Sequence, residues 1–395
     1  MKNRVKLIAA TLAVGMAATL AGCGGCLGCA GCSSCGGDSS SSALTRSNWF
    51  TGTSYNGIQP SFIEGNENFS KEIVTYAVTY DKDSAENGYV SLEYKDGSFT
   101  TEFYATEYDW TKSSIPEDYA NEKVKSETVY YYKTELKISV QYTMKTGSKE
   151  SSKWFDDHVV TESYFRAAGK NLEPVYSKQQ IKSTSPANYQ PKTLKDAYKE
   201  INVTYENFYD YSCRRVLSIT TDYTKDDPTL DSLGDDVVKS KEYGKLNKLD
   251  HTLFDNSSLY IAVRSMLKPS SSPSEKVSLF SAAAGGVDTY AISGSSSSMS
   301  EKERADYTEA LGKAGLYKSS GDEDEGVSVE AVSISYAGGD LQGTSQKVWF
   351  ASVTNANKDN NVSRATMLKL SVPISFSLGT LNYSLVSVDS TLWNG

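Results

Sequence analysis

Histidine is scarce in this chain, and the short motifs that mark many enzymes are missing. The 395 residues include only two histidines, His158 and His251. The sequence has no G-x-S-x-G or H-E-x-x-H motif, no P-loop and no dinucleotide-binding glycine pattern. These absences exclude the familiar elbow-type serine hydrolases, zinc peptidases and P-loop nucleotide enzymes. We therefore predict a protein that is not an enzyme and that needs no cofactor.

Long apolar runs and excess positive charge are also lacking. The apolar segment from Leu7 to Leu20 has 14 residues, which is too short to span a bilayer as a lasting helix. The formal net charge of −9 argues against a nucleic-acid-binding surface. In contrast, 27 tyrosines, 12 phenylalanines and 5 tryptophans supply ample surface to bury, which indicates a folded body.

The N-terminus has the features of an export signal. Residues 2–6 carry three cations, the apolar run follows, and the segment Leu20-Ala21-Gly22-Cys23 comes next. This segment resembles the lipobox of bacterial lipoproteins. The resemblance implies a signal peptide over residues 1–22, a diacylglyceryl group on Cys23, and anchoring at the extracytoplasmic face of the cell membrane. The alternative is an ordinary secretory peptide that is cleaved elsewhere.

Residues 23–47 form a tether rich in cysteine, glycine and serine. After Cys23, the thiols of Cys26, Cys29, Cys32 and Cys35 recur at every third position. Such spacing is compatible with a zinc site or an iron–sulfur cluster. However, no histidine or second cysteine pair lies nearby, and few apolar residues are available to enclose a metal. Oxidation or further acylation of these thiols is therefore favoured over metal binding.

Apolar residues at every second position predict long strands. Leu136 to Met144 alternate with polar residues, as do Leu368 to Leu378. In a third run, from Val203 to Tyr223, the apolar residues occupy odd-numbered positions, and Cys213 is one of them. Because long, one-sided antiparallel strands curl, we predict a mainly β fold, a half-barrel with two or three short helices packed on it. Its concave face either packs on helices or stays open for an apolar ligand.

Turn signals predict how the strands connect. Lys95 to Ser98 contains Asp-Gly and predicts a hairpin between strands at 89–94 and 99–110. Residues 168–171 and 378–380 predict two more hairpins. We expect one domain over residues 48–395, with polar loop insertions near 225–250 and 294–326.

Three segments have helical signals. Ser300 and Glu303 form a capping-box pattern at the start of a helix that ends near Ala314. Asp255-Asn256 precedes a second helix, predicted over Ser257 to Leu267. A third, weaker helix is predicted over Thr193 to Glu200.

A further set of segments spans most of the body: Tyr164-Phe165-Arg166, Leu172-Glu173-Pro174-Val175-Tyr176, residues 255–264, Gln346-Lys347-Val348-Trp349-Phe350, Met367-Leu368-Lys369-Leu370 and residues 379–385. Together they resemble an uncharacterised family of exported half-barrel domains, which is related in shape to the LolA-like lipoprotein carriers. The resemblance implies a fold and no activity, because the role of that family is itself unknown. The shuttle role of the LolA-like carriers is not implied, because a chain tethered by its own lipid cannot shuttle freely.

The remaining chemical candidates are weak. Each histidine follows an aspartate, but neighbouring residues of a strand point to opposite faces, so neither pair makes a dyad. An apolar position for Cys213 predicts a structural thiol, because burial suppresses the thiolate. The oxygen pattern of Asn355, Asn357 and Asp359 lacks the glycine and glutamate of a calcium loop.

We therefore hypothesise a membrane-anchored, non-enzymatic binding module for an apolar ligand or a partner protein, with that partner held in the concave face. The alternative is a structural or adhesive surface lipoprotein that contacts wall or host glycans through exposed tyrosines.

Overall fold

The computed structural model describes residues 71–82, 90–95, 97–121, 123–146, 148–168, 171–186, 198–222, 237–264, 274–318, 326–337, 345–354, 363–374 and 379–390. The first nine strands are β1 (Lys71–Asp81), β2 (Val90–Tyr94), β3 (Gly97–Asp109), β4 (Ser126–Thr146), β5 (Lys149–Ala168), β6 (Asn171–Pro186), β7 (Tyr198–Tyr209), β8 (Val216–Asp222) and β9 (Val237–Tyr243). The others are β10 (Leu253–Asp255), β11 (Glu275–Ser281), β12 (Gly286–Ser295), β13 (Val329–Tyr336), β14 (Ser345–Thr354), β15 (Ser363–Ile374) and β16 (Gly379–Ser390). The helices are the 3₁₀ turns η5 (Glu117–Tyr119), η6 (Leu246–Lys248) and η7 (Asn256–Ser258), and α2 (Leu259–Arg264) and α3 (Glu301–Lys313).

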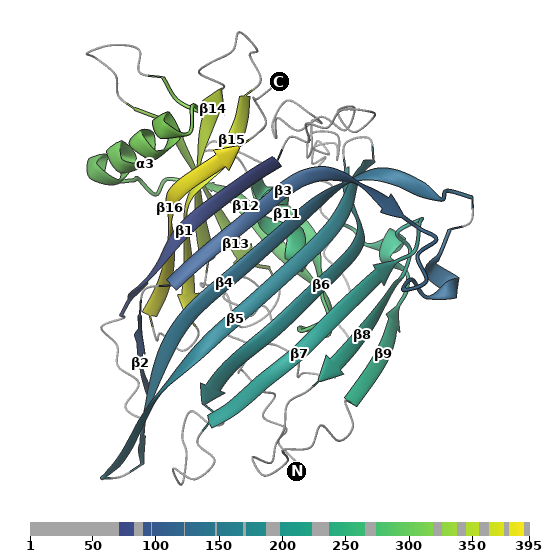
Figure 1. The fold of residues 1–395 in the computed structure, drawn as a ribbon, viewed down its shortest axis with the longest axis horizontal. Helices are drawn as coiled ribbons and strands as arrows, with labels where there is room; N and C mark the ends of the chain where they lie inside the picture. The colour runs from purple at the N-terminus through teal and green to yellow at the C-terminus, as the bar shows by residue number, and fades with distance from the viewer. Residues whose placement is uncertain are drawn as a thin grey trace, which may run out of the picture.

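All sixteen strands belong to one sheet. Its order is β10-β11-β12-β13-β14-β15-β16-β1-β3-β4-β5-β6-β7-β8-β9, and β2 pairs with β4 beside this path. The sheet curls strongly but does not close (Figure 1). Neighbours are antiparallel, except that β10 and β11 are parallel. This architecture confirms the predicted half-barrel fold class.

The strands at the centre of the sheet are unusually long. β4 has 21 residues, β5 has 20 and β6 has 16, whereas ordinary strands have about five or six. In β4, the side chains of Leu136, Val140 and Met144 are buried, and the polar residues between them face the other side. The predicted alternation over 136–144 is therefore confirmed.

The predicted continuous run from Val203 to Tyr223 is wrong. β7 ends at Tyr209 and β8 begins at Val216, and the two strands form a hairpin. The Asp210 carboxylate accepts hydrogen bonds from the backbone N–H groups of Arg214 and Arg215, at 2.6 and 2.7 Å. This local capping makes the turn, because an aspartate side chain can substitute for a backbone acceptor there.

The predicted hairpin at 95–98 is also wrong. β2 and β3 lie end to end along the same edge of β4, with Tyr94 opposite Val140 and Ser98 opposite Lys137. From Tyr94 to Ser98 the β2–β3 side advances four residues, whereas β4 advances only three, from Val140 to Lys137. The extra residue on the β2–β3 side makes a β-bulge. A Cβ atom at Gly97 would lie 2.8 Å from the Lys137 carbonyl oxygen, so the bulge requires glycine.

The hairpin predicted at 168–171 is confirmed, because Ala168 pairs with Asn171 at the β5–β6 connection. A hairpin also joins β15 and β16, but not at the predicted residues 378–380. β15 ends at Ile374, which pairs with Gly379, so Gly379 (φ +127°) and Thr380 already belong to β16.

Two of the predicted helices are confirmed in position. α3 begins after Ser300, whose side chain and that of Glu303 form the complete capping box. α2 follows η7, and Asp255 caps η7 by accepting from the Ser257 N–H. The third helix, predicted over Thr193 to Glu200, is wrong over residues 198–200, which belong to β7. Residues 193–197 lie outside the described residues. Within the described ranges, neither helix combines the length and apolar composition needed to cross a bilayer.

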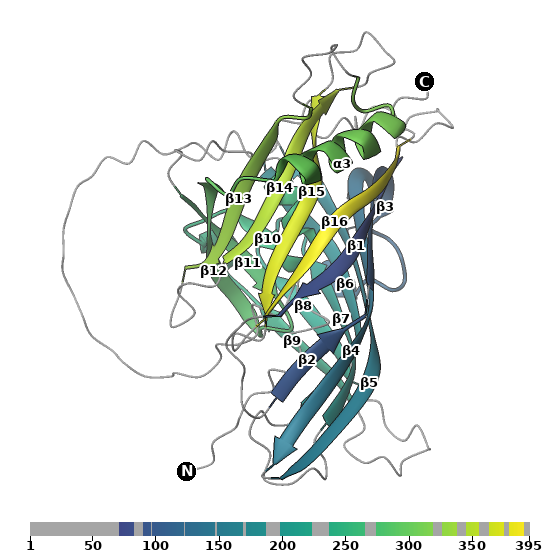
Figure 2. The ribbon, with the colours of Figure 1, turned by 90° about the vertical axis from the view of Figure 1, so that its left-hand side faces the viewer.

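The inner face of the curled sheet is packed, which is one of the two outcomes left open by the sequence. The second half of the sheet lies in a separate layer from β4–β8, and α2 lies in the interior (Figures 1 and 2). α2 contacts β10 and β15, and η7 contacts β5 and β6. Tyr260, Ile261 and Val263 of α2 are buried in the main core.

A row of aromatic side chains crosses the outer face of the sheet. Its rings pair from strand to strand at centroid distances of 4.8 to 6.0 Å. Such cross-strand pairs stabilise a sheet. The rings are buried or half-buried, so these tyrosines do not form an open stacking surface. The row consists of Tyr104, Tyr131, Tyr164, Tyr176 and Phe208.

Candidate functional site

The two edges of the open sheet meet at a seam. β9 ends one edge and β10 begins the other, and residues 244–252 connect them. Side chains cross this gap: the Phe280 ring lies 5.1 Å from the Tyr243 ring, and Lys241 Nζ donates to the Gly285 carbonyl at 3.4 Å. The seam is therefore held by packing and not by a strand ladder among the described residues.

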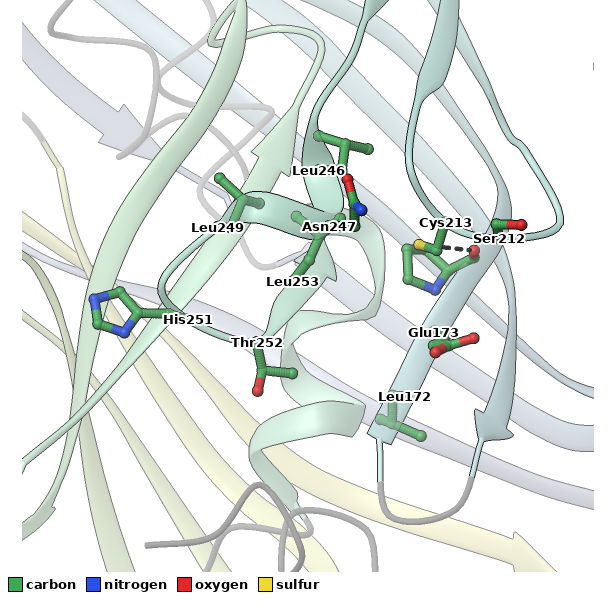
Figure 3. Close-up of a pocket in the computed structure, with 11 residues that line it drawn as sticks. Leu172, Glu173, Ser212, Cys213, Leu246, Asn247, Leu249, His251, Thr252 and Leu253 are labelled. Atoms are coloured by element: carbon green, nitrogen blue, oxygen red, sulfur yellow. Dashed lines mark hydrogen bonds between the residues drawn. The ribbon is translucent and has the colours of Figure 1, made fainter. Parts of the chain in front are cut away.

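A hollow of about 200 Å³ lies at one end of this seam, and we call it the seam pocket (Figure 3). One wall comes from the start of β6 and from the β7–β8 turn, and the other from η6 and the residues leading to β10. Aliphatic side chains line much of it, with a few polar groups among them. The lining residues are Leu172, Glu173, Pro174, Ser212, Cys213, Leu246, Asn247, Leu249, His251, Thr252 and Leu253.

Backbone hydrogen bonds hold the wall of the seam pocket opposite β6 in place. The N–H of Leu246 donates to the Arg214 carbonyl at 2.8 Å, and the N–H of Ser278 donates to the Thr252 carbonyl at 2.9 Å. The first bond ties η6 to the β7–β8 turn, and the second ties the segment before β10 to β11. The pocket is thus built before any ligand arrives, because both ends of the connecting segment are anchored.

Cys213 lies in the β7–β8 turn, not on a strand as predicted. Its φ is +52°, and its thiol lies 3.9 Å from the Pro174 carbonyl oxygen, which is the dashed contact in Figure 3. Burial, together with the nearby Glu173 carboxylate, raises the pKa of the Cys213 thiol to about 12. The thiol therefore stays protonated at neutral pH, consistent with the predicted structural role.

The two histidines lie in different places. His251 lines the seam pocket, on the side away from Cys213 (Figure 3). His158 lies on the outer face of β5, where its Nε2 is 2.8 Å from Glu135 Oε1. The carboxylate next to it, Asp157, is buried on the inner face, so the predicted opposition of neighbouring side chains is confirmed.

A charged cluster lies behind the β6 wall of the pocket. The Arg166 Nε donates to Glu173 Oε2 at 2.9 Å, and its Nη1 donates to Glu127 Oε1 at 3.0 Å. Burial alone would lower the pKa of Arg166, but the two carboxylates raise it above its ordinary value. The indole N–H of Trp110 also donates to Glu127. One buried guanidinium thus orients the Glu173 side chain at the pocket wall.

Asp255 anchors the interior helix to the sheet. Its Oδ2 accepts hydrogen bonds from Ser177 Oγ at 2.7 Å and from Tyr209 Oη at 2.5 Å. Its Oδ1 accepts from the Ser257 N–H at 2.9 Å. The sequence predicted the second role, a helix cap, but not the first. No local signal indicates that Ser177 and Tyr209 meet this carboxylate, because the contacts join distant segments.

Other predicted site residues lie outside the described residues. These are the lipidation site Cys23 and the weak metal candidates Cys26, Cys29, Cys32 and Cys35. The signal peptide and tether, residues 1–47, and the segment from Asn355 to Asp359 also lie outside them. Among the residues that the structure does describe, no group of three or more histidine, cysteine, aspartate or glutamate side chains is placed to hold a metal ion.

The chain was compared with family models, with curated proteins and with solved structures. No protein-family model matches the chain, and no curated protein matches it. The fold is similar to the crystal structure of a β-barrel-like protein of domain of unknown function DUF1849 from Brucella abortus, with a TM-score of 0.39 and 11% sequence identity. The match covers 81% of this chain and 98% of that one. The function of that domain is itself unknown.

Proposed function

We propose that the protein is a membrane-anchored, non-enzymatic binding module that holds an apolar group of a ligand or partner protein in the seam pocket. The observation that carries the proposal is the lining of that pocket, where Leu172, Pro174, Leu246, Leu249 and Leu253 surround an open hollow. The site differs from the wide concave face considered from the sequence, because α2 fills the interior of the half-barrel.

The size of the pocket suits a small apolar group. Apolar cavities of roughly 150 Å³ accept benzene, and this hollow has about 200 Å³. Each methylene removed from water contributes about 0.8 kcal/mol. A branched side chain or the end of an alkyl chain would therefore bind measurably. Asn247, Thr252 and His251 at the same pocket supply the few polar contacts that orient a ligand.

The chemistry of the lining supports binding and not turnover. The most nucleophilic residue type there, Cys213, has a raised pKa and therefore a very small thiolate population. Its thiol is directed to the Pro174 carbonyl and not to the His251 ring. Glu173, the carboxylate in the lining, is committed through Oε2 to Arg166. None of these groups has the paired geometry that acid–base or nucleophilic catalysis requires.

Titration with n-hexanol tests the pocket. We expect the methyl NMR signals of Leu246, Leu249 and Leu253 to shift in the full chain carrying Cys23→Ser, which removes the acylation site. Leu249→Ala should weaken hexanol binding about five- to tenfold, because part of the apolar lining is lost. The matched control is Val238→Ala, which truncates an aliphatic side chain of β9 that is 63% exposed. Absence of binding, or equal affinity in Leu249→Ala, would refute the proposal.

The anchor is tested separately. We expect the wild-type chain to sediment with membranes, and its N-terminal peptide to begin at Cys23 with the added mass of a diacylglyceryl group. Cys23→Ser should release the protein into the soluble fraction, because two acyl chains are needed for stable anchoring. Cys26→Ser is the control and should leave the protein in the membrane. An unmodified mature N-terminus would contradict the anchor without affecting the seam pocket.

A further inference from the structure

A second hollow lies on the opposite, outer face of the sheet, far in sequence from the seam pocket. It has a volume of about 550 Å³ and is lined by the three adjacent strands β3, β4 and β5. Strand alternation directs Ser98, Lys137, Ser139, Asp156 and His158 outward, because their neighbours Ile138 and Asp157 are buried on the inner face. We call this the outer hollow and define it by those five outward residues.

The β-bulge described above contributes to this hollow. Gly97 lines it, and the extra residue at 95–97 disrupts the regular ladder between β2–β3 and β4. Bulges bend a strand and change the direction of its side chains. A Cβ atom at Gly97 would lie 2.9 Å from Ile138 Cβ, so the glycine allows β3 to approach β4 closely at the edge of the hollow.

The outer hollow presents hydrogen-bond donors and acceptors alternately. Ser139 Oγ donates to Asp156 Oδ1 at 2.6 Å, and the other oxygen of Asp156 has no partner among the described residues. Lys137 Nζ lies 2.6 Å from Glu135 Oε1 and retains two further N–H donors. Neighbouring strands lie about 5 Å apart, so a single sugar ring would meet two or three of these groups.

Charged groups of both signs lie at the hollow, which favours a neutral ligand over a strongly charged one. Lys137 is paired with Glu135, and His158 Nε2 contacts the same Glu135 oxygen at 2.8 Å. Asp156 is partly satisfied by the Ser139 hydroxyl. An anionic polymer would meet the Asp156 carboxylate, and a cation would meet Lys137. A neutral ligand with many hydroxyl groups offers both donors and acceptors, and like charges do not repel it at Asp156 or at Lys137.

We propose that the outer hollow binds a neutral oligosaccharide, with Asp156, Lys137 and Ser139 contacting its hydroxyl groups. This site is independent of the seam pocket, and neither depends on the other. Preorganisation supports it, because the groups stand on three strands joined by continuous ladders and several are already oriented by hydrogen bonds.

Binding of defined oligosaccharides tests this inference. The probes are chitotetraose, cellotetraose and mannotetraose, titrated into the full chain carrying Cys23→Ser and followed by calorimetry and tryptophan fluorescence. We expect at least one probe to bind. Asp156→Asn should weaken binding at least tenfold, and Ser98→Phe should block it by filling the hollow.

The control is Glu309→Gln, which makes the same type of change on exposed α3 and should leave binding unaltered. Melting temperatures of all variants establish that the sheet is intact. The inference is overturned if none of the three probes binds, if Asp156→Asn and Ser98→Phe bind as the wild type does, or if only polygalacturonate, an anionic polymer, binds. None of these outcomes bears on hexanol binding in the seam pocket, so the two proposals fail separately.

Discussion

Asp157→Asn is expected to raise the free energy of unfolding at pH 8 by about 3–4 kcal/mol. Asp157 is buried on the inner face of β5, with only 2% of its surface exposed. Its Oδ1 accepts from the Thr184 N–H at 3.0 Å, and its Oδ2 has no hydrogen-bond partner among the described residues. Burial raises the pKa of this carboxyl to about 7. An asparagine would keep the bond to Thr184 and remove the buried charge.

The pH dependence of this effect has a definite sign. The unfolded chain loses the Asp157 proton near pH 4, whereas the folded protein keeps it until about pH 7. The contribution of the protonated carboxyl to stability is fully present below pH 4 and is lost as the pH rises to 7. Above pH 7 it no longer changes. The wild type should therefore lose stability relative to Asp157→Asn across this window.

Urea unfolding of both proteins at pH values from 4.5 to 8 measures the difference. Asp156→Asn is the control, because it changes the adjacent carboxylate, which faces outward and is exposed. Asp156→Asn should change the free energy of unfolding little. The slope of that free energy against pH, between pH 4.5 and 7, should equal the slope of the wild type. Equal slopes in the wild type and Asp157→Asn would show that Asp157 is ionised in the folded state at all these pH values.

Arg166→Met is expected to lower the free energy of unfolding by about 3–5 kcal/mol. The Arg166 side chain is 10% exposed and is shared between Glu127 and Glu173. It also donates to the Tyr211 carbonyl, and its guanidinium lies 4.4 Å from the centroid of the Tyr211 ring. Removing it leaves the carboxylates of Glu127, which is 18% exposed, and Glu173, which is 35% exposed, without a cation. The loss of stability thus comes mainly from the carboxylates of Glu127 and Glu173, which are left without their charged partner.

A triple variant separates that penalty from lost packing. Arg166→Met combined with Glu127→Gln and Glu173→Gln should recover most of the stability, because no buried charge is left unpaired. Lys313→Met is the control for loss of an ion pair, since Lys313 and Glu309 on α3 are both largely exposed. Chemical denaturation of the four proteins at neutral pH gives the comparison. A triple variant as unstable as Arg166→Met would mean that the guanidinium acts through packing alone.

Local patterns predicted much of the fold. Alternation over 136–144 identified β4 and its buried face, because only one side of that strand meets the core. The capping box at Ser300 and Glu303 identified the start of α3, because those two residues satisfy each other's backbone groups without help from the rest of the chain. Both signals are complete within a few residues.

The errors arose where a distant partner decides the structure. Asp96-Gly97 suits a hairpin by composition, but the β4 edge pairs with both flanking strands and makes the glycine part of a bulge. The run from Val203 to Tyr223 keeps one parity across a turn, so alternation alone could not show the hairpin capped by Asp210. In both cases long-range pairing overrides a local preference.

The candidate sites were less predictable than the fold. His251 and Cys213 line one pocket only because residues 244–252 pass from one edge of the sheet to the other. The outer hollow depends on the register of three strands and on a bulge. The sequence contains Trp154, Asp156 and His158 at alternate positions, which shows a shared face but not the indentation beside it.

The strand order has a consequence for how the molecule assembles. Read from β10 through β16 and then from β1 to β9, the sheet is a simple up-and-down meander, apart from its parallel first pair and the interruption at β2. The natural chain is a circular permutation of that meander, opened between β16 and β1 and joined between β9 and β10. The junction of the halves therefore unites residues such as Asn382 and Asp81, 301 positions apart.

Closing a loop of that length costs about 5 kcal/mol of chain entropy. We therefore expect the two halves to form early as separate meanders and the β1–β16 ladder that unites them to form late.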